Sequence, residues 1–249
     1  MQIRRHSIDH FGTRFEIFVV SIIYLFNNSR RLYRWRIKTS FIMKTKTLQW
    51  IVMGFFALGF VGLAIPWTFP FFVMLTPLAV VVAWAMLIMA HERPIDWRFF
   101  SALGIVFALS YAVELLKVHA FFGEGLFFFG DSFGPILLNI PLMIGLCWVA
   151  LLYICAAVAE RLNTNVVVKV LASSGLVVLF DIALELVAHK LDFWYWTWEI
   201  PIWNYVLWFV SAVVMFTIMK LFGVRIENRL ATTMYVTLII FLLLLHVII

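Results

Sequence analysis

The residues most capable of chemistry in this sequence are a few ionisable side chains inside long apolar stretches. Glu114 is the one acid of its stretch, whereas Asp181 and Glu185 share another stretch that ends on His189. These last three recur every four residues, so on a helix they would form one stripe along one face. A carboxyl group shielded from water tends to keep its proton, which makes each acid a candidate proton donor.

The acids are also related by their depth in a membrane. Glu114 and Asp181 each lie fifteen residues after the start of their apolar stretch, which is about 22 Å along a helix. Both would therefore lie at one level in the outer part of a bilayer, where Asn139 and Asn204 enter from two further stretches. A purely structural interpretation stays open, because buried polar groups can simply hold helices together.

An aromatic segment, Phe-Trp-Tyr-Trp-Thr-Trp at residues 193–198, follows the second acidic stretch. One interpretation is an aromatic belt at the level of the lipid headgroups. The other is an aromatic wall against an apolar or cationic ligand, because ring faces stabilise a cation within about 6 Å. The two interpretations are compatible.

Composition predicts the elements that position these residues. Of 249 residues, 65% are apolar and 13% are charged, against about 45–50% and 25% in soluble domains. Seven stretches approach the roughly 20 apolar residues that a membrane span needs. They are Leu48–Ile65, Phe69–Ala90, Phe99–Leu116, Pro135–Ala159, Val166–His189, Pro201–Phe222 and Leu230–Ile249. The sequence therefore predicts an all-α transmembrane bundle of about seven spans, with residues 43–249 as one domain.

The basic tail, residues 1–42, contains one apolar run at 15–26 that is too short to span a bilayer. We expect a mis-set start, with translation beginning at Met43, because the first span follows it directly. The rival interpretation is an interfacial helix with a polybasic anchor.

The distribution of positive charge predicts orientation in the cell (inner) membrane. With a cytoplasmic N-terminus and an external C-terminus, seven Lys and Arg residues of the connections lie inside and two lie outside. The inner ones are Arg93, Arg98, Arg161, Lys169, Lys220, Arg225 and Arg229, and the outer ones are Lys117 and Lys190. The net charge of +6 thus reflects topology, and we expect no nucleic-acid partner.

Several chemistries are excluded by residue type and spacing. Cys147 and Cys155 lie eight residues apart in one apolar stretch, about 12 Å along a helix, too far for a disulfide. The six histidines are too few for a membrane di-iron enzyme, and no zinc spacing or Gly-rich phosphate loop is present. The last stretch lacks the lysine that a retinal protein needs. The sequence therefore argues against a di-iron or zinc centre, a phosphate-binding loop and a bound retinal.

Three short stretches between Glu114 and Trp208 carry a family resemblance. They are Val113-Glu114 with Phe121–Gly123; Gly130–Pro135 leading to Ile140-Pro141 and Trp148; and Asp181, Glu185, Trp194, Trp196, Ile200-Pro201, Asn204 and Trp208. In order and spacing they resemble the integral-membrane carotenoid biosynthesis proteins that include bisanhydrobacterioruberin hydratase and γ-carotene 1′,2′-hydratase. Leu186, Asn139 and Leu207 depart from the family pattern of Pro, Gly and Gly, which puts the shape of the substrate in question.

The resemblance implies cofactor-free addition of water to the terminal isoprenoid double bond of a linear carotenoid, that is, a carotenoid hydratase. Protonating such an alkene gives a tertiary carbocation, so Asp181 is the first candidate acid and Glu114 the second. The predicted roles of the other residues are water activation by Glu185 and His189, cation stabilisation by Trp194 and Trp196, water placement by Asn139 and Asn204, and further substrate contacts by Asp131 and Trp208.

Three other functions stay open at this point. A carotenoid cyclase would share the protonation step and quench the cation internally. A proton- or ion-coupled transporter would also place acids in its spans, although the chain shows no inverted repeat. A scaffold for other membrane enzymes is the third. The expected partners are a carotenoid or other long isoprenoid, the lipid bilayer and other carotenoid-pathway membrane enzymes.

Overall fold

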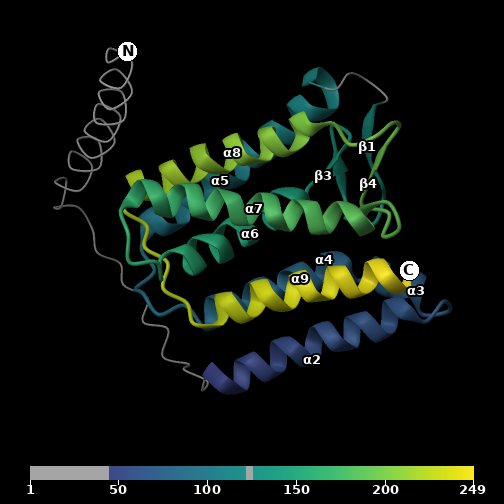
Figure 1. Ribbon diagram of the computed structural model, residues 1–249, viewed down its shortest axis with the longest axis horizontal. Helices are drawn as coiled ribbons and strands as arrows, with labels where there is room; N and C mark the ends of the chain where they lie inside the picture. Colours follow the sequence, from purple (N-terminus) through teal and green to yellow (C-terminus); the bar gives the residue numbers. More distant parts are fainter. Residues whose placement is uncertain (1–44, 122–125) are drawn as a thin grey trace, which may run out of the picture.

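A computed structural model describes residues 45–121 and 126–249. The basic tail and Met43, for which we stated expectations, lie outside these residues, as do Gly123 and Glu124. The predicted all-α bundle of membrane type is confirmed (Figure 1). Its α-helices are α2 Thr45–Ala64, α3 Phe69–Met74, α4 Thr76–Met89, α5 Trp97–Leu116, α6 Met143–Ala159, α7 Val166–Ala188, α8 Ile202–Leu221 and α9 Leu230–Ile248, and a π-helical turn, η1 Lys117–Phe121, extends α5.

Five of the described helices are long and apolar enough to cross a membrane, namely α2, α5 with its extension, α7, α8 and α9. The other two expected spans contain shorter apolar helices, α4 and α6. Many large apolar side chains on the outer helix faces are exposed, Leu58, Met74 and Val210 among them. Lipid can cover such faces, because every backbone polar group inside a helix is already paired.

The expected span Phe69–Ala90 is not one helix. It divides at Leu75 into α3 and α4, and each begins with a proline in its first two positions, Pro70 and Pro77. A proline has no N–H to donate, and its ring clashes with the carbonyl four residues earlier, so Pro77 ends the preceding helix and starts the next.

The prediction that Pro135–Ala159 forms one helical span is also wrong for the first part of that range. Residues 136–141 form a hairpin of β2 Ile136–Leu137 and β3 Ile140–Pro141, and α6 begins only at Met143. The turn residues Leu138 and Asn139 have φ of 52° and 63°, as a two-residue type I′ hairpin turn requires. Apolar content alone suggested a helix here, although Pro135 and Pro141 oppose one.

Four helices form the inner bundle: α5 packs on α6, α6 on α7, α7 on α8, and α8 on α5. Helix α9 packs against α6, α7 and α2, so α2 and α9 form a second layer beside the bundle (Figure 1). Capping side chains mark the start of two bundle helices. The Asp96 side chain accepts from the Phe99 N–H at the start of α5, and the Asn165 side chain accepts from Val168 at the start of α7.

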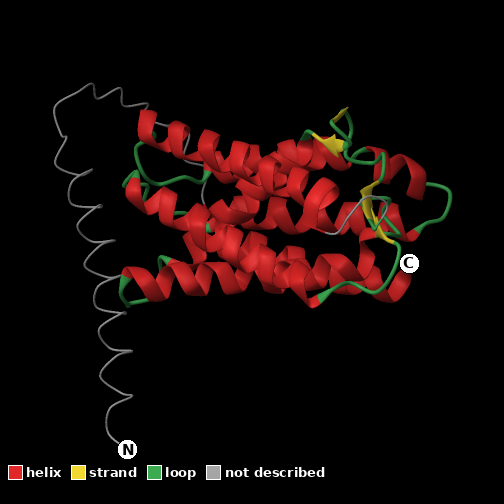
Figure 2. Cartoon of the chain, turned by 90° about the horizontal axis from the view of Figure 1, so that it is seen from above, coloured by secondary structure: helices red, strands yellow, loops and turns green. Residues whose placement is uncertain are grey.

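The two longest connections pair with each other at one end of the bundle. Strand β1 Phe127–Phe129 runs antiparallel to β4 Trp194–Trp196, with Phe127 opposite Trp196 and Phe129 opposite Trp194. Figures 1 and 2 place these strands at the opposite end from the α4–α5, α6–α7 and α8–α9 connections. The aromatic segment is thus half of a small sheet that closes one end of the bundle.

Candidate active site

The three candidate acids meet beneath the small sheet. Glu114 on α5 is 1% exposed, and Asp181 and Glu185 on α7 are 0% and 8% exposed. Asp181 lies within electrostatic range of Glu185, of Glu114 and of a lysine, Lys117. The structure therefore places the acids of two helices in one cluster.

Glu185 is held by nitrogen donors from two elements. The indole N–H of Trp194 donates to Oε2 at 2.9 Å, and that of Trp196 reaches both carboxyl oxygens at 3.3 Å. The amide nitrogen of Asn204, on α8, donates to Oε1 at 3.3 Å. An ionised carboxylate is an acceptor only, so this set of donors suits the charged form of Glu185.

Glu114 forms an ion pair with Lys117 that is buried, whereas the sequence indicates at most a pair on the helix surface. Its Oε2 lies 3.2 Å from the ammonium nitrogen of Lys117, and its Oε1 accepts from the indole N–H of Trp148 at 3.0 Å. The Lys117 ammonium also lies 4.2 Å from the ring centre of Phe127 and 5.8 Å from that of Trp208, within the range of cation–π attraction.

The sequence places Lys117 in an external connection, as an ordinary loop charge. The available signal was its spacing of three residues from Glu114, between the apolar neighbours Leu116 and Val118. That spacing fits an exposed helix pair equally well, so burial of the pair was not predictable from it.

Asp181 has fewer partners than the other two acids. Its Oδ2 accepts from the Asn204 amide at 3.2 Å. Four buried polar atoms of the cluster have no hydrogen-bond partner among the described residues: Asp181 Oδ1, Asn204 Oδ1, Trp208 Nε1 and Glu114 Oε2. Of these, Glu114 Oε2 still has the ion pair with Lys117. Asn204 and Trp208 are one turn apart on α8, so these unmatched acceptors and this donor suit a small polar molecule.

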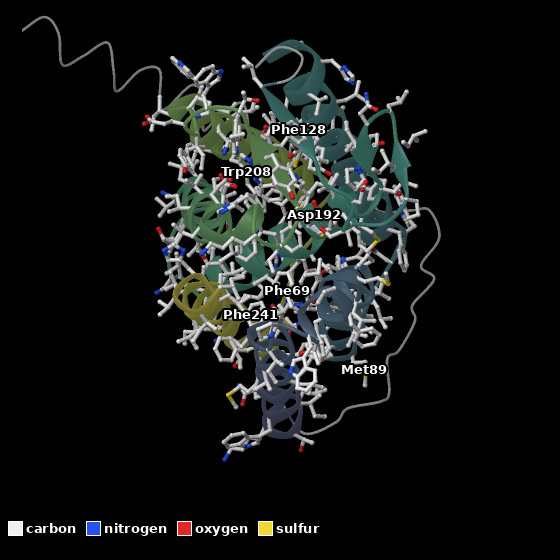
Figure 3. All side chains as sticks on the ribbon, turned by 90° about the vertical axis from the view of Figure 1, so that its right-hand side faces the viewer. Phe69, Met89, Phe128, Asp192, Trp208 and Phe241 are labelled. Atoms are coloured by element: carbon white, nitrogen blue, oxygen red, sulfur yellow. The ribbon has the colours of Figure 1, made fainter. Side chains whose placement is uncertain are left out.

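A cavity of about 400 Å³ adjoins the acid cluster. Its lining is almost wholly apolar and comes from α2, α3, α4, α6, α7, α8 and α9, with Trp148, Trp194 and Trp208 on the side of the acids. Two lining residues, Trp208 and Phe241, are labelled in Figure 3, which views the bundle from the strand end. The volume falls within the range of about 300–1,000 Å³ for small-molecule sites.

The tryptophans connect the cavity to the acids. Trp148 and Trp208 stack with ring centres 4.2 Å apart, and each is less than 5% exposed. Trp148 and Trp194 both line the cavity and donate their N–H groups to Glu114 and Glu185. An apolar ligand in the cavity would therefore contact indole rings whose polar edges bond the carboxyl cluster.

The segment Gly130–Pro135 anchors the sheet over this site. The Ser132 hydroxyl donates to the Leu191 carbonyl at 2.9 Å, and the Phe133 ring lies 4.4 Å from that of Phe193. A Cβ on Gly130 would come within 2.3 Å of Asp192, so only glycine permits this approach.

The structure places three candidate residues apart from the cluster. Asp131 is exposed at the edge of the anchoring segment, Asn139 is exposed in the β2–β3 turn, and His189 is exposed at the end of α7. The predicted stripe of Asp181, Glu185 and His189 is thus buried only over its first two members. Within the described residues, no group of three or more His, Cys, Asp or Glu side chains could hold a metal ion.

These features define an α-helical bundle of integral-membrane type, with a carboxyl cluster beside an apolar cavity. The chain belongs to the carotenoid biosynthesis protein family, whose model matches residues 69–249. The resemblance in the short motifs is thereby confirmed, and the protein has a role in carotenoid biosynthesis. No curated protein and no solved structure gives a significant match.

Proposed function

We propose that the protein is a cofactor-free carotenoid hydratase, which adds water across the terminal isoprenoid double bond of a linear carotenoid. One observation carries the proposal: the apolar cavity is walled by tryptophans that bond directly to buried carboxyl groups. The cavity would accept a hydrocarbon end group, and the acids behind its wall would supply and remove the proton.

Asp181 is the proposed proton donor. Glu185 has three nitrogen donors and Glu114 has a lysine partner, whereas Asp181 has one amide donor and no ion pair among the described residues. Burying an unpaired charge is costly, so Asp181 is the acid best suited to be held neutral. The alkene π pair takes its proton, leaving a carboxylate and a tertiary carbocation.

The surrounding groups would then complete the addition. Indole rings at the cavity wall stabilise the cation, and a water placed by Asn204 Oδ1 and Trp208 Nε1 gives its lone pair to the cationic carbon. The oxonium proton passes to the Glu185 carboxylate, which shares the Asn204 amide with Asp181. Return of that proton to Asp181 closes the cycle, and the net change is one added water.

Lys117 has a positioning role in this scheme. Its ammonium group pairs with Glu114 and lies within cation–π range of the rings of Phe127, Trp196 and Trp208, so it would fix the position of that carboxyl group and of those rings. The ion pair would keep this side of the site polar, and Glu114 would provide a second base close to the water.

We also infer seven crossings for residues 43–249, with the N-terminus cytoplasmic and the C-terminus external. The three basic connections meet at one end, where His91 bridges to Asn228 and the Arg161 side chain donates to the Asn228 carbonyl at 3.3 Å. The chain ends near the strands at the other end (Figure 1). Lys and Arg residues are concentrated at the end that holds the basic connections, which supports placing that end in the cytoplasm.

Expression in a lycopene-producing host tests the proposal. We expect a new, more polar carotenoid whose mass exceeds that of its precursor by one water. A new product of unchanged mass would instead indicate the cyclase, which quenches the cation internally. An unchanged pigment profile, with the protein present in the membrane, would contradict both enzymes.

A further inference from the structure

A second cavity, of about 260 Å³, lies between the α4–α5 and α8–α9 connections, at the end of the bundle away from the acids. Its lining includes three arginines, Arg93, Arg98 and Arg225, and one acid, Asp96. No residue of this cavity takes part in the proposed reaction. We call it the arginine pocket.

The positive charge of the arginine pocket is only partly compensated. Arg93 pairs with Glu227, and Asp96 is occupied as the N-cap of α5, accepting from the Phe99 N–H at 3.1 Å. Neither Arg98 nor Arg225 forms an ion pair with an acid of the described residues. These two guanidinium groups are therefore available to an anion.

His91, which also lines the pocket, adds no charge at neutral pH. Burial lowers the pKa of its imidazole to about 4, against a smaller opposing effect of Glu227. Its Nδ1 lies 2.7 Å from the Tyr153 hydroxyl, so its ring is directed into the protein and leaves the arginines to face the cavity.

The pocket opens where a lipid headgroup would lie. Trp97 and Phe100, on the first turn of α5, are 52% and 59% exposed, and the Arg98 guanidinium lies 5.8 Å from the Trp97 ring centre. Exposed tryptophan beside arginine is typical of the membrane interface. An acyl chain could follow the apolar surface of α5 from this point.

We propose that the arginine pocket binds a phosphate-bearing anion, with the headgroup of an anionic phospholipid as the ligand that its position indicates. Guanidinium groups bind phosphate oxygens through paired N–H donors, and basic pockets between helices at a membrane surface recognise anionic headgroups.

Purified full-length protein would be titrated in detergent with phosphatidylglycerol or phosphatidylcholine, and the melting temperature and retained lipid phosphorus measured. Phosphatidylglycerol is expected to bind and to raise the melting temperature, whereas phosphatidylcholine is not. In the double variant Arg98→Gln, Arg225→Gln, binding should be about 30-fold weaker, which corresponds to about 2 kcal/mol at 1.4 kcal/mol per tenfold.

The matched control is Lys46→Gln with Arg229→Gln, which removes two exposed positive charges that do not line the pocket. Lys46 lies in the first turn of α2, and Arg229 precedes α9 and pairs with the exposed Glu92. The control should bind like the unmodified protein. Higher salt should weaken binding by the unmodified protein, a readout that does not depend on folding of the variants. An equal effect of inorganic phosphate would assign the pocket to a free phosphate compound. Equal binding of both lipids, no salt dependence, or equal loss in the control would overturn the proposal.

Discussion

Replacing Asp181 with asparagine tests whether this residue is an acid or a packing group. The carboxyl group accepts one hydrogen bond, at 3.2 Å from the Asn204 amide, and an asparagine oxygen can accept the same bond. The shape of the side chain is kept, and the side chain is 0% exposed, so no new surface is created. What is lost is the proton that the alkene must receive.

The two interpretations predict effects of different size. General acid catalysis contributes about 10²–10⁴-fold, so Asp181→Asn should lower the rate of hydration at least a hundredfold. If Asp181 only joins helices, the change should be small, because interhelical hydrogen bonds in membranes average about 0.6 kcal/mol. An energy of that size changes an equilibrium constant by less than a factor of 10.

The assay compares the ratio of hydrated to unhydrated carotenoid in a lycopene-producing host, with membrane level and monodispersity of the protein measured in parallel. Ser174→Ala is the matched control, because Ser174 is equally buried on α7 but donates only within its own helix, to Val170. We expect the control to keep full activity. An Asp181→Asn protein that is folded and within tenfold of full activity would remove Asp181 from the mechanism.

Three further predictions concern the ion pair, the cavity and the topology. Lys117→Met should lower the melting temperature, because breaking a buried pair costs about 3–5 kcal/mol. Adding Glu114→Gln to this variant should restore stability but not activity. An unchanged melting temperature of Lys117→Met would argue against the pair. Ala83→Phe, which fills the cavity, should reduce product formation, whereas Val81→Phe on the same helix, outside the lining, should not; equal effects would disconnect the cavity from the substrate. A reporter fused after Ile249 should be active only outside the cytoplasm, and removal of residues 1–42 should leave insertion and activity intact.

Much of the fold was predictable from sequence, because a bilayer imposes a simple rule on the chain. A span needs about 20 apolar residues with every backbone group paired in a helix, so α2, α5, α7, α8 and α9 could be located within a few residues. The rule failed where apolar residues occur without a helix. The β2–β3 hairpin is as apolar as a span, and its prolines and left-handed turn residues decided its structure.

The sequence by itself also determined which residues could do chemistry. Acids are rare in apolar stretches, and counting residues from the start of each stretch placed Glu114 and Asp181 at one depth. Depth follows from the fixed rise of a helix, so it can be read from one chain. The motifs between Glu114 and Trp208 were likewise sufficient to indicate the family.

Only the tertiary structure decided what surrounds those acids. The partners of Glu185 come from β4 and α8, and the partner of Glu114 on α6 is Trp148. Such contacts depend on how each helix is rotated about its axis and where helices cross, and packing across the whole bundle sets both. The same packing buried Lys117 within the site, left His189 exposed, and opened an apolar cavity beside the tryptophans.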